Sequence, residues 1–206
     1  MNNLIDELRT FLPKYLSADS TKELLDLFKD FPENINDRFY SQFLKDEDII
    51  FQGDGLQNIP VIELPKTDVK YSKCIVLSNT CDIDLTNKRF FPSSICYAPI
   101  ISVTKYYNLL VNKSNKPEAY IKSHIEDIRK QKITQILYLP KGSGLNDESI
   151  VFLDKINNIS NNHIDRKISN RLFILSDYGL YILLLKISIH FTRIQEKIDR
   201  FKGEIL

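Results

Sequence analysis

The stretch Cys74-Ile75-Val76-Leu77-Ser78-Asn79-Thr80-Cys81-Asp82 places an unbroken apolar run directly before a polar cluster. A continuous run of this kind, rich in β-branched residues, is typical of a strand that is covered on both faces. The polar residues that follow favour a tight turn, because Asn and Asp side chains can bond to nearby backbone groups. The stretch therefore predicts a buried strand over 74–77 that ends in a turn over 78–82.

Further short apolar segments surround this strand in the sequence. They are residues 49–55, 59–64, 95–101, 136–139 and 149–153. The last two segments flank a Gly-containing turn at 141–144 and predict a hairpin. Together with the helical patterns at both ends of the chain, these segments predict an α+β fold.

We expect one domain over residues 1–206. Apolar residues recur at helical spacing in the N-terminal part, which predicts a helical cap over 1–45. The β-rich core is expected over 49–156, with one inserted helix over 117–131 that has Pro117 in its first turn. Residues 157–170 are rich in Asn and show no clear period, which indicates a loop.

The C-terminal segment 176–201 predicts a long amphipathic helix. Its apolar seam alternates by four and three residues: Leu180, Leu184, Ile187, Phe191, Ile194, Ile198 and Phe201. A basic ridge follows the same rhythm beside the seam: Lys186, His190, Arg193, Lys197 and Arg200. We expect the seam to dock on the sheet, with the ridge beside it.

The composition places the chain among ordinary folded proteins. It has 43% hydrophobic and 27% charged residues, and 28 Lys and Arg against 27 Asp and Glu give a net charge of +1. No strong overall field therefore favours a polyanionic partner. Three cysteines argue against a disulfide-rich secreted module, and neither a secretory signal nor a membrane-spanning segment is expected. We expect a cytoplasmic protein that does not enter a membrane.

The predicted turn is one candidate for a catalytic site. Ser78 or Cys81 could act as a nucleophile, and Asp82 as a base or as a carboxylate that orients another group. The alternative is a purely structural turn, in which Asn79 and Asp82 bond to the backbone and Cys81 packs as a small apolar residue. The spacing alone favours the structural alternative, since no known nucleophile motif is present.

The second candidate is the pair His190 and Arg193. Residues three apart share one face of a helix, so an imidazole and a guanidinium here could meet one anion, such as a phosphate. The alternative is a solvated face on which Arg193 pairs with Glu196. The sequence leaves both alternatives open.

Neither a metal nor a cofactor is expected. Cys74 and Cys81 are seven residues apart, and His124, His163 and His190 are scattered, which does not match the ligand spacing of structural zinc sites. The turn at 141–144 also lacks the spacing of a phosphate-binding loop.

Three short motifs resemble the small β-barrel toxins of the MazF/PemK type. They are Gly53-Asp54, Ile75-Val76-Leu77-Ser78-Asn79 and Ala98-Pro99-Ile100-Ile101-Ser102, within residues 53–102, about a quarter of the chain. The resemblance implies a small SH3-like β-barrel, or a curled antiparallel sheet, with helices attached. Many members of that family cut single-stranded RNA without a metal. The catalytic Arg-Pro of the family is replaced here by Ser72-Lys73-Cys74, so the resemblance supports the barrel more than the activity.

Two functions follow as hypotheses. The first is a bacterial interaction or regulatory module with a protein partner, such as a toxin–antitoxin or phage-defence component. The alternative is a metal-independent endoribonuclease-like enzyme of the MazF/PemK type that binds RNA, with Asp82 as base or orienting group and His190 and Arg193 as acid and phosphate stabiliser. An exposed apolar patch near Phe39 or Phe43 would favour a protein partner. A positive groove between Arg193 and Lys73 would favour RNA.

Overall fold

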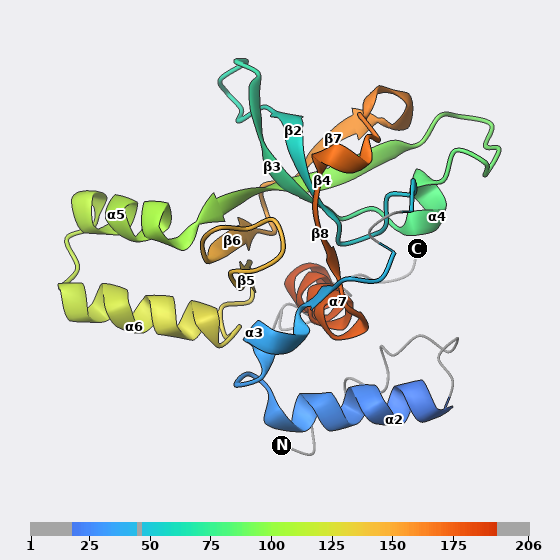
Figure 1. The fold of residues 1–206 in the computed structure, drawn as a ribbon. Helices are drawn as coiled ribbons and strands as arrows, with labels where there is room; N and C mark the ends of the chain where they lie inside the picture. The colour runs from blue at the N-terminus through green and yellow to red at the C-terminus, as the bar shows by residue number, and fades with distance from the viewer. Residues whose placement is uncertain (1–17, 45–46, 193–206) are drawn as a thin grey trace, which may run out of the picture.

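The computed structural model describes residues 18–44 and 47–192 of the chain (Figure 1). The helices are α2 (Ala18–Leu27), α3 (Ile35–Arg38), α4 (Thr80–Ile83), α5 (Val103–Lys113), α6 (Glu118–Arg129) and α7 (Asp177–Thr192), with short 3-10 turns at Phe28–Asp30, Asn161–His163 and Ile168–Asn170. The strands are β1 (Tyr40–Ser41), β2 (Gly55–Val61), β3 (Lys70–Val76), β4 (Ser94–Ser102), β5 (Ile136–Leu139), β6 (Ser149–Phe152), β7 (Asn157–Ser160) and β8 (Arg171–Leu175). The α+β fold class is confirmed.

The strands form one antiparallel sheet in the order β1-β8-β2-β3-β4-β6-β5, with β7 also paired to β4. The sheet curls until its two ends meet through a loop. The Tyr40 hydroxyl of β1 donates to Pro140 O at 2.7 Å, and the Ser143 hydroxyl donates to Leu172 O at 3.3 Å. Among the described residues, β1 and β5, the two end strands of the sheet, do not pair with each other. These side-chain contacts join the two ends instead. Of the two expected arrangements, the curled antiparallel sheet is therefore confirmed, and the barrel is not closed.

Strand β4 changes partner along its length. Its first residues pair with β7, while Ile100–Ser102 pair with β6. Pro99 lies between these two segments, and a proline, which cannot donate a ladder hydrogen bond, is tolerated where no such bond is required. Beyond Pro99, β4 and β6 therefore run in a different direction from β2 and β3 (Figure 1).

Two clusters of buried side chains hold the fold. The larger cluster lies between the sheet, α6 and α7, and Phe39, Ile75, Leu139 and Phe173 belong to it. The smaller cluster joins β2, β3 and β4 to α4 and the segment after β7, through residues such as Ile83 and Ile95. Because Ile75 and Cys74 belong to different clusters, β3 is covered on both faces, as its apolar run predicts.

A bulge in β2 aligns its apolar side chains. Leu56 lies opposite Cys74, whereas Ile59 lies opposite Ser72, so β2 carries one extra residue between these pairs. Asn58 accommodates the bulge with a φ of 59°. Leu56, Ile59 and Val61 are consequently all buried on the same face of the sheet.

Several predicted boundaries are wrong. Residues 40–41 of the expected helical cap form β1, and the core holds helices α4 and α5 in addition to the expected helix, which the structure shows as α6. The β-rich core also continues past residue 156. Segment 157–170, which the sequence indicates as a loop, contains β7, and β8 follows it. β7 and β8 pair with strands that are distant in the chain, so the local sequence pattern does not predict them.

The C-terminal helix is confirmed as α7, but it does not bury the face that the sequence predicts. Tyr178, Ile182, Leu183 and Lys186 are buried, whereas Phe191 of the expected seam is exposed. Side chains distributed around the helix are buried because α2, α3, β5 and β8 all pack against it. Residues 193–201 of the expected helix lie outside the described residues. In the described part of the chain, no helix has the length and apolar character needed to cross a membrane.

Candidate functional site

The predicted turn exists, and its side chains mainly fix the backbone. It contains the short helix α4, whose N-cap Asn79 accepts a hydrogen bond from Cys81 N–H at 2.9 Å. The Ser78 hydroxyl accepts a hydrogen bond from Cys96 N–H at 2.8 Å and so ties the turn to β4. Ser78 therefore links the turn to β4, and the bond that Asn79 accepts is one that the structural alternative predicts.

A neighbouring loop supports the same turn. Gln52 N–H donates to the Thr80 hydroxyl at 3.0 Å, and the Gln52 amide donates to Leu77 O at 2.7 Å. These bonds join residues 25 or more positions apart in the chain, so they hold the turn against the loop before β2. The turn is thus a fixed part of the scaffold.

Cys81 and Asp82 present the accessible chemistry of this turn. Cys81 is a free, exposed thiol, and the half-exposed Asp82 carboxylate forms an ion pair with Arg89. The Asp82 carbonyl accepts bonds from the Ser93 hydroxyl at 2.7 Å and from the Asn161 amide at 3.2 Å. Arg89 is absent from the sequence hypothesis because no spacing rule connects positions 82 and 89 in an irregular loop.

The structure places His190 on α7, where its ring centroid lies 4.7 Å from that of Phe191. The imidazole is half-buried. Arg193 lies outside the described residues. Ser78, Cys81 and Asp82 therefore lie together on one turn, while the meeting of His190 and Arg193 with Asp82 stays a prediction.

The Gly53-Asp54 motif of the family resemblance forms an anchor in the interior. Gly53 has a φ of +88°, and a Cβ there would lie 2.6 Å from the Leu175 side chain. The fully buried Asp54 carboxylate accepts from Phe51 N–H at 3.0 Å and lies 3.1 Å from Arg171 Nε. Burial raises the pKa of Asp54 to about 7, against the opposing effects of the Phe51 N–H and Arg171. This motif fixes the entry to β2 rather than offering an accessible carboxylate.

No candidate metal centre was found among residues 18–44 and 47–192: no group of three or more His, Cys, Asp or Glu residues there could hold an ion. The three cysteines are free, and burial raises the pKa of Cys74 to about 12. The Cys74 thiol is consequently held in its neutral form at ordinary pH.

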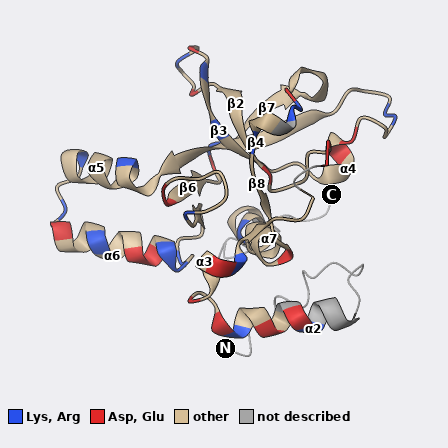
Figure 2. Ribbon diagram, in the orientation of Figure 1, with Lys and Arg blue, Asp and Glu red and all other residues tan. Residues whose placement is uncertain are grey.

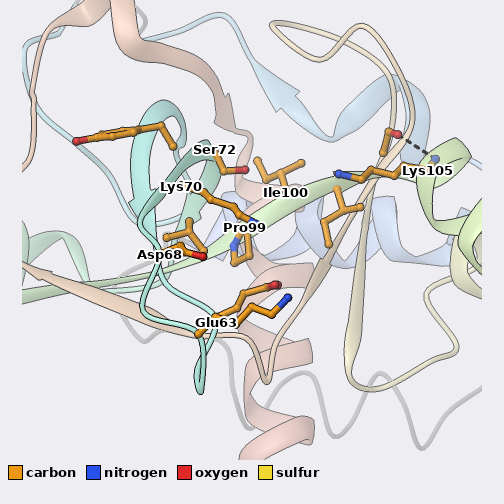
Figure 3. Close-up of a pocket in the computed structure, with 12 residues that line it drawn as sticks. Glu63, Asp68, Lys70, Ser72, Pro99, Ile100 and Lys105 are labelled. Atoms are coloured by element: carbon orange, nitrogen blue, oxygen red, sulfur yellow. Dashed lines mark hydrogen bonds between the residues drawn. The ribbon is translucent and has the colours of Figure 1, made fainter.

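A different hollow, the β3–β4 groove, lies where β3 and β4 separate (Figure 3). It has a volume of about 320 Å³. Its lining combines apolar side chains with several charged ones: Val61, Glu63, Lys66, Asp68, Lys70, Tyr71, Ser72, Pro99, Ile100, Ile101, Ser102 and Lys105. The groove therefore offers both an apolar floor and a charged rim.

The separation of the two strands creates this groove. The β3–β4 ladder runs from Val76 opposite Tyr97 to Cys74 opposite Pro99 and ends there. Beyond that point β3 continues beside β2, while β4 continues beside β6. The groove occupies the fork between these two directions.

The net charge of the groove is more positive than a count of its charged lining residues suggests. Lys66, Lys70 and Lys105 line it together with Asp68 and Glu63. Glu63, however, is paired at 3.2 Å with Lys155, a residue outside the lining. In Figure 2 the β2–β3 hairpin carries both positive and negative residues, and further cations lie along the loop between α4 and β4. The rim of the groove is accordingly cationic in balance.

Large apolar side chains are exposed beside the groove. They belong to the β2–β3 hairpin, which projects from the sheet (Figure 1): Ile62, Leu64, Val69 and Tyr71. Leu64 is 81% exposed and Tyr71 is 72% exposed. A second exposed pair, Phe90 and Phe91, lies on the loop between α4 and β4.

No protein-family model matches the chain, and a search of curated proteins found no match. The resemblance to MazF/PemK toxins is therefore neither supported nor contradicted by these comparisons. The groove itself is absent from the sequence hypotheses, because it depends on where β4 leaves β3. Pro99 within an apolar strand was the one local signal that could have indicated such a break.

Proposed function

We propose that this chain is an interaction module that binds a protein partner through the β2–β3 hairpin and the adjoining β3–β4 groove. The observation that carries the proposal is the exposure of Ile62, Leu64, Val69 and Tyr71 on one projecting hairpin. Contiguous apolar side chains on a protein surface mark sites of association, since their burial against a partner removes apolar area from water.

The location of the apolar surface differs from the sequence expectation. Phe39 is fully buried in the larger core cluster, while Phe43 is exposed. The hairpin carries more exposed apolar side chains than this region, and it lies beside a groove that can receive a partner's side chains. A regulatory component of a bacterial toxin–antitoxin or phage-defence system is the role that fits such a module and the family resemblance.

Site-specific photo-crosslinking tests the proposal. A photoreactive amino acid at position Leu64 of the full chain, irradiated in the bacterial cell, is expected to crosslink one recurring protein. The purified partner should then bind the Leu64→Asp/Tyr71→Asp variant about tenfold or more weakly, since buried apolar contacts dominate most interfaces.

The matched control is Phe90→Asp/Phe91→Asp, which places the same charges on the other exposed apolar loop. It should bind the partner like the wild type, and circular dichroism should show that both variants are folded. Equal binding by the hairpin variant and the wild type would overturn the proposal, as would the absence of a recurring crosslink.

A second candidate function is metal-independent cleavage of RNA, for which the Asp82 region provides one favourable observation. The Asp82 carboxylate contacts Arg89, and the exposed Phe90 and Phe91 rings follow directly. Cations next to exposed aromatic rings are a common arrangement for binding single-stranded nucleic acid, because bases stack on such rings.

Incubation with mixed RNA in the presence of a chelator tests this candidate. Asp82→Asn should abolish cleavage if Asp82 is the base, while Asp84→Asn, two residues away, should retain it. Equal cleavage by the wild type and Asp82→Asn would indicate a contaminating nuclease and would remove this candidate.

A further inference from the structure

The outer edge of β3 faces the β3–β4 groove. Val76 bonds to the β2 side, since its N–H donates to Asp54 O and its carbonyl accepts from Gly53 N–H, both at 2.9 Å. Backbone groups point alternately to the two sides of an antiparallel strand, so those of Lys73 and Tyr71 point to the β4 side. The last pair of the β3–β4 ladder, Cys74 with Pro99, is flanked by Lys73, whereas Tyr71 lies past the end of the ladder and lines the groove. The backbone groups of Tyr71 therefore stand at the groove, where another strand could pair with them.

The charges around this edge favour an acidic ligand. Lys70 approaches the groove from the hairpin and Lys105 from α5, on opposite walls (Figure 3). Asp68 is the acidic side chain of the lining that remains once Glu63 is paired with Lys155. The groove also adjoins the beginning of the eleven-residue helix α5, where the helix dipole adds partial positive charge.

The floor of the groove determines which side chains would fit. Val61, Pro99 and Ile101 give it an apolar surface between the lysines. Side chains of an extended segment alternate between two faces, so every second one would point toward this floor. An acidic segment with apolar residues at alternate positions matches both the floor and the rim.

We propose that the β3–β4 groove binds an extended acidic segment of the partner protein, which adds as a strand to the outer edge of β3. This inference rests on the proposed function and names the form in which the partner is recognised. Main-chain hydrogen bonds to the edge of β3 at Tyr71 supply affinity, and the apolar floor and the lysines supply selectivity, as in other cases of strand addition.

Selection from a displayed library of random dodecapeptides tests the charge and the pattern. With the purified full chain as bait, enriched peptides should be rich in Asp and Glu and carry apolar residues at every second position. The best peptide should bind the Lys70→Glu/Lys105→Glu variant about tenfold more weakly, because two attractive charges become repulsive. The matched control Lys88→Glu/Lys141→Glu makes the same charge change outside the groove and should bind within about twofold of the wild type.

N-methylation of the best peptide tests strand addition itself, and it requires no change to the protein. Methyl groups on one set of alternate amides should weaken binding at least about tenfold, because those N–H groups donate to β3. Methyl groups on the other set should change affinity less than about threefold. Recognition through side chains alone would show no dependence on the set that is methylated, and this result would overturn the proposal.

Other results would also overturn the inference. The library could yield no enriched peptide, or the enriched peptides could bind Lys70→Glu/Lys105→Glu like the wild type. A fluorescent single-stranded RNA whose binding is lost in that variant would assign the groove to nucleic acid. A dimer that dissociates in the same variant, measured by light scattering, would assign it to a second copy of the chain.

The two proposals can fail separately. If the protein crosslinked at Leu64 binds through the hairpin while no peptide shows dependence on the methylated set, the proposed function stands and strand addition fails. If neither the crosslinked partner nor any peptide binds, the interaction function itself fails.

Discussion

The interior and the β3–β4 groove both contain polar side chains, but they use them differently. In the interior, Asp54, Asn161 and Lys186 bond to specific backbone or side-chain atoms. In the groove, Lys70 and Lys105 lie on an open surface whose cations outnumber its unpaired carboxylates. A buried polar group must find a partner within the fold, whereas a groove can offer its charges to a ligand. The comparison therefore separates residues that maintain the fold from residues available for binding.

The buried Asp54–Arg171 pair should give the largest effect on stability. Above pH 7, where Asp54 is ionised in the folded protein, Asp54→Ala leaves the Arg171 guanidinium in the interior without its carboxylate, and such losses cost about 3–5 kcal/mol. Urea denaturation should show this decrease in the free energy of unfolding. The control Asp68→Ala removes a carboxylate from the groove and should change stability by less than about 0.5 kcal/mol. Equal effects of the two substitutions would contradict the comparison.

Lys186 should produce a pH-dependent effect of intermediate size. Its ammonium is buried and donates to Gln131 O at 3.0 Å and to Ile133 O, and burial lowers its pKa to about 7. Between pH 7 and 10 the unfolded chain therefore binds this proton more strongly than the folded chain does. The free energy of unfolding should consequently rise with pH, by on the order of 1 kcal/mol per pH unit.

Lys186→Met removes this contribution and leaves the other titrating groups in place. The stability of the wild type relative to the variant should increase between pH 7 and 9, measured by denaturation of both proteins at each pH. A constant difference across that range would show that the lysine keeps its proton in the folded state.

Asn161 should give a somewhat smaller effect. Its buried amide donates to Ile83 O at 3.0 Å and to the Ser93 hydroxyl at 2.9 Å, so it links the segment after β7 to the turn. Asn161→Ala removes these two bonds and also the side-chain oxygen to which Arg166 donates, and it should cost about 1–3 kcal/mol in thermal or chemical denaturation. The control Asn115→Ala changes an exposed asparagine and should leave the stability almost unchanged. An equal loss of stability in this control would show that the bonds of Asn161 are not the cause of its effect.

The groove lysines should have the smallest effect on the fold. Lys70→Glu/Lys105→Glu should change the free energy of unfolding by less than about 0.5 kcal/mol, because substitutions of surface charges usually do. A larger loss, measured in the same urea titration, would show that these lysines support the structure. Their charges could then no longer be interpreted as available for a ligand.

Local patterns predicted much of the sheet. The apolar runs at 74–77, 95–101, 136–139 and 149–153 correspond closely to β3, β4, β5 and β6, and the expected helix over 117–131 corresponds to α6. These elements carry their signal in consecutive residues. β8 was missed because its pairing with β1 and β2 joins residues more than 100 positions apart.

The candidate site was predicted only in part. The turn over 78–82 was located correctly, since a polar cluster after an apolar run is a local signal. The contacts that decide what its residues do, such as Asp82 with Arg89 and Ser78 with Cys96, come from loops and a neighbouring strand. The orientation of α7 was likewise missed, because neighbours on several sides bury Lys186 despite its charge.

Patterns between near neighbours in the chain are enough to specify the α+β class, the strand over 74–77 and the turn that ends it, because periodicity and turn chemistry act locally. The point at which β4 leaves β3, and with it the groove and the open edge of β3, is set by the packing of distant segments. That choice depends on the competition among β3, β6 and β7 for the two sides of β4. Competition between segments far apart in the chain is settled by packing of the whole molecule.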